Sequence, residues 1–256
     1  MAQITIGLGP DNSINSNKNI SNLVYDSLAL YYDASRTYSY DGTTAVFTDL
    51  SGNGRDATFY NLITSTYTDN SPSAPFWSNE GGGSFLMNGG YFGKIPTWSL
   101  GSQSSISAWI KTSSTSTVAI LGHCNGGPVH ANWSIANGRM EYHYYYNGWY
   151  YSYGTATNVN SNTWKFITWT LSGTTLKTYI NGSLDSTATL VGPMTSSMGS
   201  LGSKWGPCMS DSYGAGTDGM SAGFNGYMAM VMAHSKTLSV SEILQNYNNT
   251  KFRFGL

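Results

Sequence analysis

Apolar and polar residues alternate with a period of two over many short stretches of the chain. Residues 105–110 show this most clearly, since Ile106, Ala108 and Ile110 fall on one side and Trp109 on the other. Such alternation is typical of β-strands that bury one face. Similar short runs recur from residue 23 onward and predict many strands rather than long helices.

Turn signals separate these runs. Asn-Gly pairs at 137–138, 147–148 and 181–182 predict two-residue type I′ hairpin turns, because Asn and Gly tolerate the positive φ angles that this turn requires. A fourth turn is predicted at Ser-Gly 172–173, and residues 224–234 read as a long final strand. Consecutive hairpins build antiparallel sheets, and this many strands predicts an all-β sandwich of two antiparallel sheets, a jelly roll.

One short helix is expected near the C-terminus. Ser239 and Glu242 have the spacing of a capping box, in which each side chain bonds a free backbone N–H at the start of the helix. Ile243, Leu244 and Tyr247 then form an apolar stripe with helical spacing. The stripe predicts that this helix packs against the sandwich.

Length and composition favour one large domain. The chain has 256 residues, of which only 10% are charged while 14% are aromatic. This mix disfavours disorder and suits short strands joined by turns. Residues 23–256 are expected to form the sandwich domain. The polar, unpatterned residues 1–22 are expected to be an N-terminal arm, either a flexible terminus or a tether that docks onto a neighbouring subunit.

Charge and hydropathy exclude some partners. The formal net charge is −1 and there is no basic block, so no nucleic acid partner is expected. No run approaches the roughly 18 apolar residues of a membrane span, so no membrane partner is expected either. Cys124 and Cys208 are the two cysteines, and their spacing leaves open whether they are reduced thiols or a disulfide.

An aromatic ribbon at residues 142–153 is the most unusual feature of the sequence. With a two-residue turn at 147–148, Tyr146 would pair with Trp149 and Tyr144 with Tyr151 on one face. Exposed Tyr and Trp offer flat apolar faces with polar tips. The ribbon could stabilise a sheet edge, contact another subunit or stack on sugar rings. The candidate ligand-binding residues are Tyr144, Tyr146, Trp149, Tyr151 and, in a Gly-rich loop at 206–223, Tyr213.

Catalysis is not expected. Glycan hydrolysis requires two carboxylates that flank the scissile bond, which on a strand means acids at i and i+2 or i+4. The three glutamates, Glu80, Glu141 and Glu242, have no acid at these positions. Asp211 and Asp218 are too far apart in sequence to form such a pair on a strand. The chain is therefore read as a non-enzyme.

Several segments together resemble the concanavalin A-like lectin/glucanase superfamily, in its laminin-G-like form. The resemblance extends over residues 25–256 and implies a jelly roll with a recognition role. It also implies that a calcium ion could bind at the rim, with Asp33, Asp49 and Asn53 as ligands, although the same loop makes a good turn without metal. The segments are 31–34, 49–57, 83–89, 106–110, 164–169, 176–182, 224–229 and 238–243.

The ending at residues 245–255 is similar to copies of this module in tailed bacteriophages. This implies a virion protein, a capsid decoration or head-fibre subunit, with residues 1–22 docking it to other virion proteins and with homo-oligomers expected. One alternative is a tail or baseplate adhesin that binds host surface glycans. A cellular carbohydrate-binding lectin and a glycoside hydrolase are the remaining alternatives.

Overall fold

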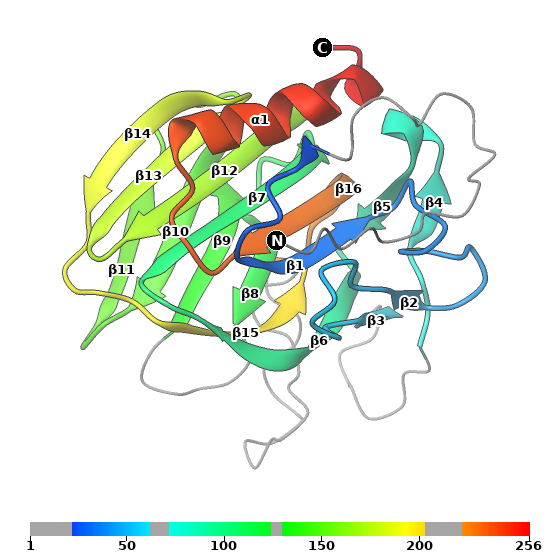
Figure 1. Cartoon of the computed structure of the whole chain (residues 1–256), viewed down its shortest axis with the longest axis horizontal. Helices are drawn as coiled ribbons and strands as arrows, with labels where there is room; N and C mark the ends of the chain where they lie inside the picture. The colour runs from blue at the N-terminus through cyan, green and yellow to red at the C-terminus, as the bar shows by residue number, and fades with distance from the viewer. Residues whose placement is uncertain (1–21, 62–71, 124–129, 203–221) are drawn as a thin grey trace, which may run out of the picture.

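Two antiparallel sheets of eight strands each pack face to face, as the alternating pattern predicts (Figure 1). The structure is a computed structural model that describes residues 22–61, 72–123, 130–202 and 222–256. Most of the expected arm, both cysteines and Tyr213 lie outside these described residues. The all-β sandwich with a short C-terminal helix is confirmed.

The first sheet, sheet A, has the strand order β14-β13-β12-β7-β16-β5-β4, and β1 also pairs with β16. β16 therefore bonds β7 along one edge and both β1 and β5 along the other. The strands of sheet A are β1 (Leu28–Asp33), β4 (Phe76–Ser78), β5 (Ser84–Asn88), β7 (Gln103–Lys111), β12 (Lys165–Ser172), β13 (Thr175–Ile180), β14 (Ser183–Thr189) and β16 (Asn225–His234).

The second sheet, sheet B, has the order β11-β10-β9-β8-β15-β6-β3-β2. A single 3₁₀ turn, η3 (Glu80–Gly82), precedes β5 in the chain. The strands of sheet B are β2 (Val46–Phe47), β3 (Ala57–Asn61), β6 (Tyr91–Leu100), β8 (Val118–His123), β9 (His130–Ala136), β10 (Arg139–Tyr145), β11 (Trp149–Tyr153) and β15 (Ser196–Leu201).

The main core lies between the two sheets. Ile106, Ala108 and Ile110 of β7 point into it, while Trp109 packs in a second apolar cluster on the outer face of sheet A. This is the division that the alternation in β7 predicts. Burial of so many apolar side chains supplies the main driving force for folding.

The helix α1 (Val240–Thr250) and the 3₁₀ turn η4 (Lys251–Phe254) cover this second cluster (Figure 1). The capping box is confirmed, with Ser239 and Glu242 each bonding the other's backbone N–H. Ile243 is buried, but Leu244 is more than a third exposed, so the apolar stripe is narrower than predicted. The buried hydroxyl of Thr250 instead accepts a hydrogen bond from the Trp109 indole at 2.7 Å.

Two of the predicted hairpin turns have the expected register. Ala136 pairs with Arg139 and Ile180 with Ser183 across Asn-Gly turns whose φ angles are all positive. The turn predicted at 172–173 lies one residue later, at 173–174, because Ser172 pairs with Thr175. This shift moves the pairing by an even number, so each side chain keeps its face.

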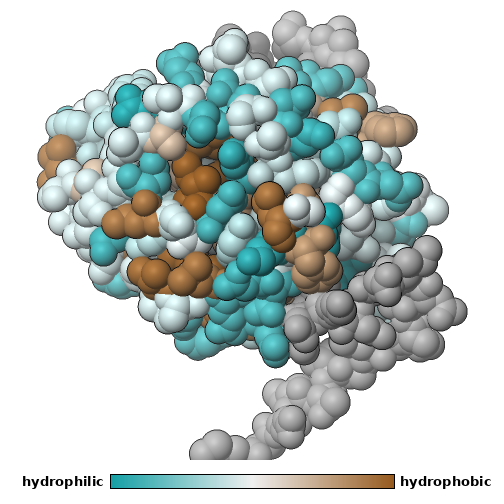
Figure 2. All heavy atoms as spheres, turned by 90° about the horizontal axis from the view of Figure 1, so that it is seen from above, coloured by the Kyte–Doolittle hydropathy of each residue, from teal (hydrophilic) through white to brown (hydrophobic). Residues whose placement is uncertain are grey.

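Viewed from the side on which α1 lies, the surface is mostly polar, and apolar atoms form small separate patches (Figure 2). The exposed apolar side chains of this region include Val240, Leu244, Phe252 and Leu256. Scattered residues of this kind are normal on soluble domains. Within the part of the chain that the structure describes, no helix is long and apolar enough to cross a membrane.

Candidate functional site

The β10–β11 hairpin differs from the prediction at its turn. Tyr145 pairs with Trp149, and Tyr146 belongs to a three-residue loop with the Asn-Gly pair at 147–148. Asn147 takes the left-handed conformation, with φ 53°. The predicted pairing of Tyr146 with Trp149 is therefore wrong. The one-residue difference exchanges the faces of all β11 side chains relative to those of β10.

This register changes the role of the candidate tyrosines. Tyr144 pairs with Tyr150 and is buried in the core between the sheets, where its hydroxyl accepts a hydrogen bond from the Val191 N–H at 3.2 Å. Tyr144 therefore cannot present its ring to a ligand at the surface. Tyr146 is half-buried, and its ring lies so close to Gly192 that an added Cβ there would come within 2.4 Å of it. Tyr146 thus packs against the protein itself.

Trp149, Tyr151 and Tyr153 lie on the outer face of sheet B and form what we call the aromatic strip. They are 45%, 54% and 40% exposed, the largest exposures among the aromatic side chains of this hairpin. The rings of Tyr151 and Tyr153 are parallel within 4°, with centroids 6.3 Å apart. That spacing matches two residues along a strand. The strip lies on β11, the edge strand of sheet B.

One face of each tyrosine of the strip is covered by a neighbour on β10. The imidazole of His143 stacks on Tyr151 with centroids 4.3 Å apart and planes within 3° of parallel. The Arg139 guanidinium lies 5.4 Å from the Tyr153 ring centroid, in a cation–π arrangement. Since the two side chains remain 54% and 40% exposed, part of each ring still meets solvent. The strip therefore offers flat faces held in a fixed orientation.

Polar side chains continue the outer face from the strip across β10 and β9. The Ser134 hydroxyl donates to the Glu141 carboxylate at 2.7 Å, and Glu141 pairs across the hairpin with Tyr153. Asn132 pairs with His143 in the same way. Asn132, Ser134, Glu141 and His143 are all buried although they face away from the core. Burial raises the pKa of the Tyr153 hydroxyl, and the Glu141 carboxylate raises it further.

Glu141 has no second acid beside it among the described residues of sheet B. The residues directly opposite it are Ser134 on β9 and Tyr153 on β11, and two positions along β10 stand Arg139 and His143. A glycosidase needs a second carboxyl group within about 5–9.5 Å. Asp211 and Asp218 lie outside the described residues. The described part of this face thus lacks an adjacent carboxylate pair.

Asp33, a proposed calcium ligand, is fully buried and its oxygens are occupied by protein donors. The Arg253 Nη1 atom lies 3.0 Å from both carboxylate oxygens. The N–H and hydroxyl of Ser35 donate to Oδ1, and the Tyr31 hydroxyl donates to Oδ2. A cation at this position would have to displace these donors and lie beside a guanidinium. Asp33 therefore serves as an anchor for the C-terminal turn.

Asp49 and Asn53 also fit a turn better than a calcium ion. Asp49 accepts hydrogen bonds from the N–H groups of Tyr31, Ser51 and Arg55. The Asn53 amide nitrogen, which cannot ligate a cation, points to backbone carbonyls of β1. In the described part of the chain no group of three or more His, Cys, Asp or Glu residues could hold a metal ion. The arrangement of Asp33, Asp49 and Asn53 around protein hydrogen-bonding partners thus does not fit a calcium ion.

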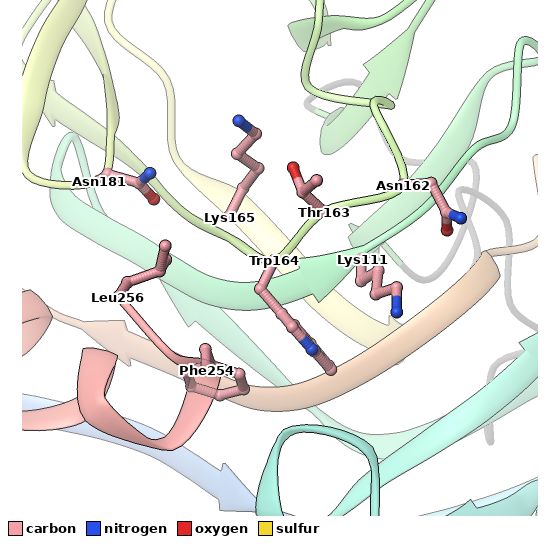
Figure 3. A pocket seen from close by; sticks show the side chains of 8 residues that line it. All are labelled: Lys111, Asn162, Thr163, Trp164, Lys165, Asn181, Phe254 and Leu256. Atoms are coloured by element: carbon pink, nitrogen blue, oxygen red, sulfur yellow. The ribbon is translucent and has the colours of Figure 1, made fainter.

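A hollow of about 460 Å³ lies on the other side of the molecule, beside the start of β12 (Figure 3). Trp164 and Phe254 point toward each other in it, whereas Lys165 extends to the opposite side of the strand. Trp164 is 8% exposed, and the ammonium of Lys111, which lines the hollow, is already bonded to Glu80 at 2.9 Å. The hollow thus offers less aromatic surface than the strip. Its lining residues are Lys111, Asn162, Thr163, Trp164, Lys165, Asn181, Phe254 and Leu256.

The strip retains part of the predicted site. Trp149 and Tyr151 are exposed as the sequence predicts, and Tyr153 joins them. The predicted contribution of Tyr213 lies outside the described residues. Glu141, His143 and Ser134 were missed as neighbours of the strip. The prediction assumed a two-residue loop. With a three-residue loop, alternation along β10 places His143 and Glu141 on the same face as the strip.

The chain belongs to the family described as the concanavalin A-like lectin/glucanases superfamily, whose model matches residues 87–244. The fold and the matched region, which runs from β5 into α1, agree with this assignment. A comparison with curated proteins found no match.

Several solved structures are similar in fold. One is domain 4 of AbnA, an extracellular arabinanase from Geobacillus stearothermophilus, in complex with arabinotriose. It has a TM-score of 0.61 and 18% identity, and the match covers 86% of this chain and 98% of that domain. Another is the binding domain of botulinum neurotoxin DC in complex with rat synaptotagmin II, with a TM-score of 0.57 and 16% identity. That match covers 90% of this chain but only 53% of the toxin domain.

A third similar structure belongs to a study of botulinum neurotoxin type C, whose cell entry depends on interaction with two ganglioside molecules. Its TM-score is 0.54 and its identity 16%, with 89% of this chain and 52% of the other covered. The chain thus spans about half the length of the toxin domains that it matches. At these identities the comparisons show a shared fold.

Proposed function

We propose that the protein is a non-catalytic recognition module that binds glycans through the aromatic strip on the outer face of sheet B. The observation that carries this proposal is the strip itself, because three aromatic side chains that are 40% or more exposed stand in line on one strand. Flat ring faces with polar tips suit the apolar faces and hydroxyl rims of sugars. Backing by His143 and Arg139 holds the two tyrosines in place before a ligand arrives.

The family and the similar structures support glycans as the ligand class. The family description includes lectins, and two of the similar structures concern proteins that interact with arabinotriose or gangliosides. Binding rather than hydrolysis is supported by the position of Glu141, which faces Ser134 and Tyr153 instead of another acid. Hydrolysis of a bound glycan that is lost in Glu141→Gln would contradict the non-catalytic part of the proposal.

A glycan array followed by titration calorimetry tests the binding. The wild-type protein should bind at least one class of glycan, and Trp149→Ala and Tyr151→Ala should each weaken this binding. Tyr38→Ala is the matched control, because Tyr38 is also an exposed tyrosine and its turn lies beside β2, at the opposite edge of sheet B from β11. Absence of any glycan signal, or equal binding by all four proteins, would refute the proposed site.

We further propose that the module is a homo-oligomeric component of a tailed-phage virion, a capsid decoration or head-fibre subunit whose residues 1–22 contact other virion proteins. Support comes from the likeness of residues 245–255 to phage copies and from the polar composition of residues 1–22. Mass spectrometry and antibody labelling of purified particles would test it. Labelling of the tail instead of the head would favour the adhesin alternative, and absence from particles would refute both.

A chain that lacks residues 1–22 tests the docking role separately from glycan binding. It should keep its affinity for the glycan, because the strip lies on β11, and should lose its association with the particle. Unchanged association would remove residues 1–22 from the docking mechanism.

A further inference from the structure

The segment that precedes β1 is bound to α1 and to the end of β16 by contacts to its backbone. The carbonyl of Asn22 accepts hydrogen bonds from the amides of Gln245 and Asn249, at 2.7 and 3.1 Å. The Val24 N–H donates to the buried amide oxygen of Asn246 at 2.9 Å. We call residues 22–26 the leading segment.

His234 makes the remaining backbone contact. Its Nε2 atom lies 2.8 Å from the Val24 carbonyl oxygen, and both residues are buried. A carbonyl oxygen only accepts, so Nε2 must carry the proton. The side chains of Leu23 and Val24 complete the attachment, since both are buried in the cluster beneath α1.

The other imidazole nitrogen of His234 faces no acceptor in the described part of the chain that could bond an added proton. Nδ1 of His234 is buried and has no hydrogen-bonding partner among the described residues. Protonation would create an N–H there with no acceptor, together with a buried positive charge. Both effects disfavour the charged form in the bound arrangement. The Val24 carbonyl could accept from the charged imidazole as well and raises the pKa of His234, so the preference for the neutral form comes from burial and from Nδ1, which faces no acceptor within the described ranges.

The charged groups around His234 come from three elements. Lys236 follows β16 and opposes a positive imidazole, whereas Asp26 of the leading segment and Glu242 of α1 favour one. The Lys236 ammonium lies 2.5 Å from Asp26 and 2.6 Å from Glu242, so the three groups together carry one net negative charge, and Asp26 and Lys236 are partly exposed to screening solvent. Burial remains the largest influence and lowers the pKa of His234 below its usual 6.5.

We propose that His234 is a pH-sensitive latch that holds the leading segment against α1 at neutral pH and releases it in acid. Release would free the leading segment from its contacts with α1 and β16. The strands of both sheets would stay paired, because Leu23 and Val24 pack outside the main core. The switch is separate from the aromatic strip, which belongs to the other sheet.

Hydrogen–deuterium exchange of the full chain between pH 7.5 and 5.0 tests the latch. Protection factors corrected for intrinsic exchange should fall for peptides covering residues 22–28 by at most about tenfold per pH unit, as the uptake of one proton allows. Peptides covering β12 should keep their protection. An NMR titration should place the His234 pKa below 6.5 and within the range in which protection is lost.

His234→Gln is the decisive variant, because a glutamine amide can donate to the Val24 carbonyl but does not titrate in this range. Protection of residues 22–28 should then be independent of pH. The proposal is overturned if wild-type protection does not change, if the glutamine variant loses protection in the same way, or if His234 titrates at or above 6.5. A parallel loss in β12 would also overturn it, since this would indicate global unfolding.

Discussion

The imidazole of His143 and the ring of Tyr151 are stacked almost in parallel across the β10–β11 hairpin, 4.3 Å apart. One of these side chains is nearly buried and the other is the most exposed residue of the aromatic strip. The pair therefore joins the interior of the sheet face to the proposed ligand surface. A ring that is fixed from behind loses less conformational entropy when a ligand stacks on its front.

Because His143 supports the Tyr151 ring, we expect His143→Ala to weaken glycan binding although His143 itself would not contact the glycan. Aromatic pairs contribute about 0.5–1.5 kcal/mol, which corresponds to a loss of roughly 2- to 10-fold in affinity. Tyr151→Ala should cost more, because it removes the contact surface itself. Titration calorimetry with the best glycan from the array measures both. His143→Phe keeps a flat ring and should bind nearly as the wild type does. If it loses as much as the alanine variant, stacking is not the cause.

The buried ion pair of Asp33 and Arg253 predicts a large loss of stability when one partner is removed. Arg253→Met leaves the buried Asp33 carboxylate with only the more distant Arg36 guanidinium, at 3.7 Å, as a countercharge, which should cost up to about 3–5 kcal/mol. Urea unfolding followed by tryptophan fluorescence measures this. Glu80→Gln, which breaks the partly exposed pair with Lys111, serves as the comparison and should cost about 1 kcal/mol or less. Equal losses would show that Arg253 does not compensate a buried charge.

Gly81 and Gly173 provide a test of close packing at matched backbone geometry, with φ angles of 63° and 62°. A Cβ at Gly81 would lie 2.6 Å from the Phe254 ring and 2.8 Å from Trp164, whereas a Cβ at Gly173 meets nothing within 4 Å. Gly173→Ala should cost about 1–2 kcal/mol from conformation alone. Gly81→Ala should cost about 1–3 kcal/mol more. Similar midpoints of thermal unfolding for both variants would contradict the packing argument.

Glu242 predicts an acid-dependent contribution from the start of α1. Hydrogen bonds from Lys236 and from Ser239 lower the pKa of Glu242 from 4.5 to about 2. Since the folded-state pKa lies below the unfolded one, the contribution is complete above pH 4.5 and is lost as the pH falls toward 2. The difference in unfolding free energy between wild type and Glu242→Gln should therefore shrink over this range. A difference that stays constant would assign the effect to something other than the carboxylate charge.

Local patterns in the sequence were enough to predict most of the fold. The Asn-Gly turns at 137–138 and 181–182, the alternation in β7 and the capping box of Ser239 each depend on neighbours a few residues away. Such short-range relations are readable from sequence, because turn conformations and helix caps have strong residue preferences.

The candidate site was harder to predict because it depends on register and on distant partners. The same Asn-Gly signal at 147–148 lies in a three-residue loop, and this exchanged Tyr144 for His143 on the outer face. The carboxylate of Asp49, which the sequence offered as a calcium ligand, instead accepts hydrogen bonds from backbone N–H groups of its own turn and of β1. Contacts such as Arg253 with Asp33 join residues 220 apart in sequence. Spacing along the chain carries no information about such pairs.

The position of β16 has a consequence for how the protein is made. This strand is the last to be synthesised, yet it bonds β7, β1 and β5 and so holds together strands from the first half of the chain. Until Asn225–His234 leaves the ribosome, β1 lacks its partner in sheet A, and the β4–β5 pair is not joined to the rest of that sheet. Contacts over such long separations slow folding, because the intervening chain must first be ordered. Closure of sheet A must therefore wait until β16 has been synthesised.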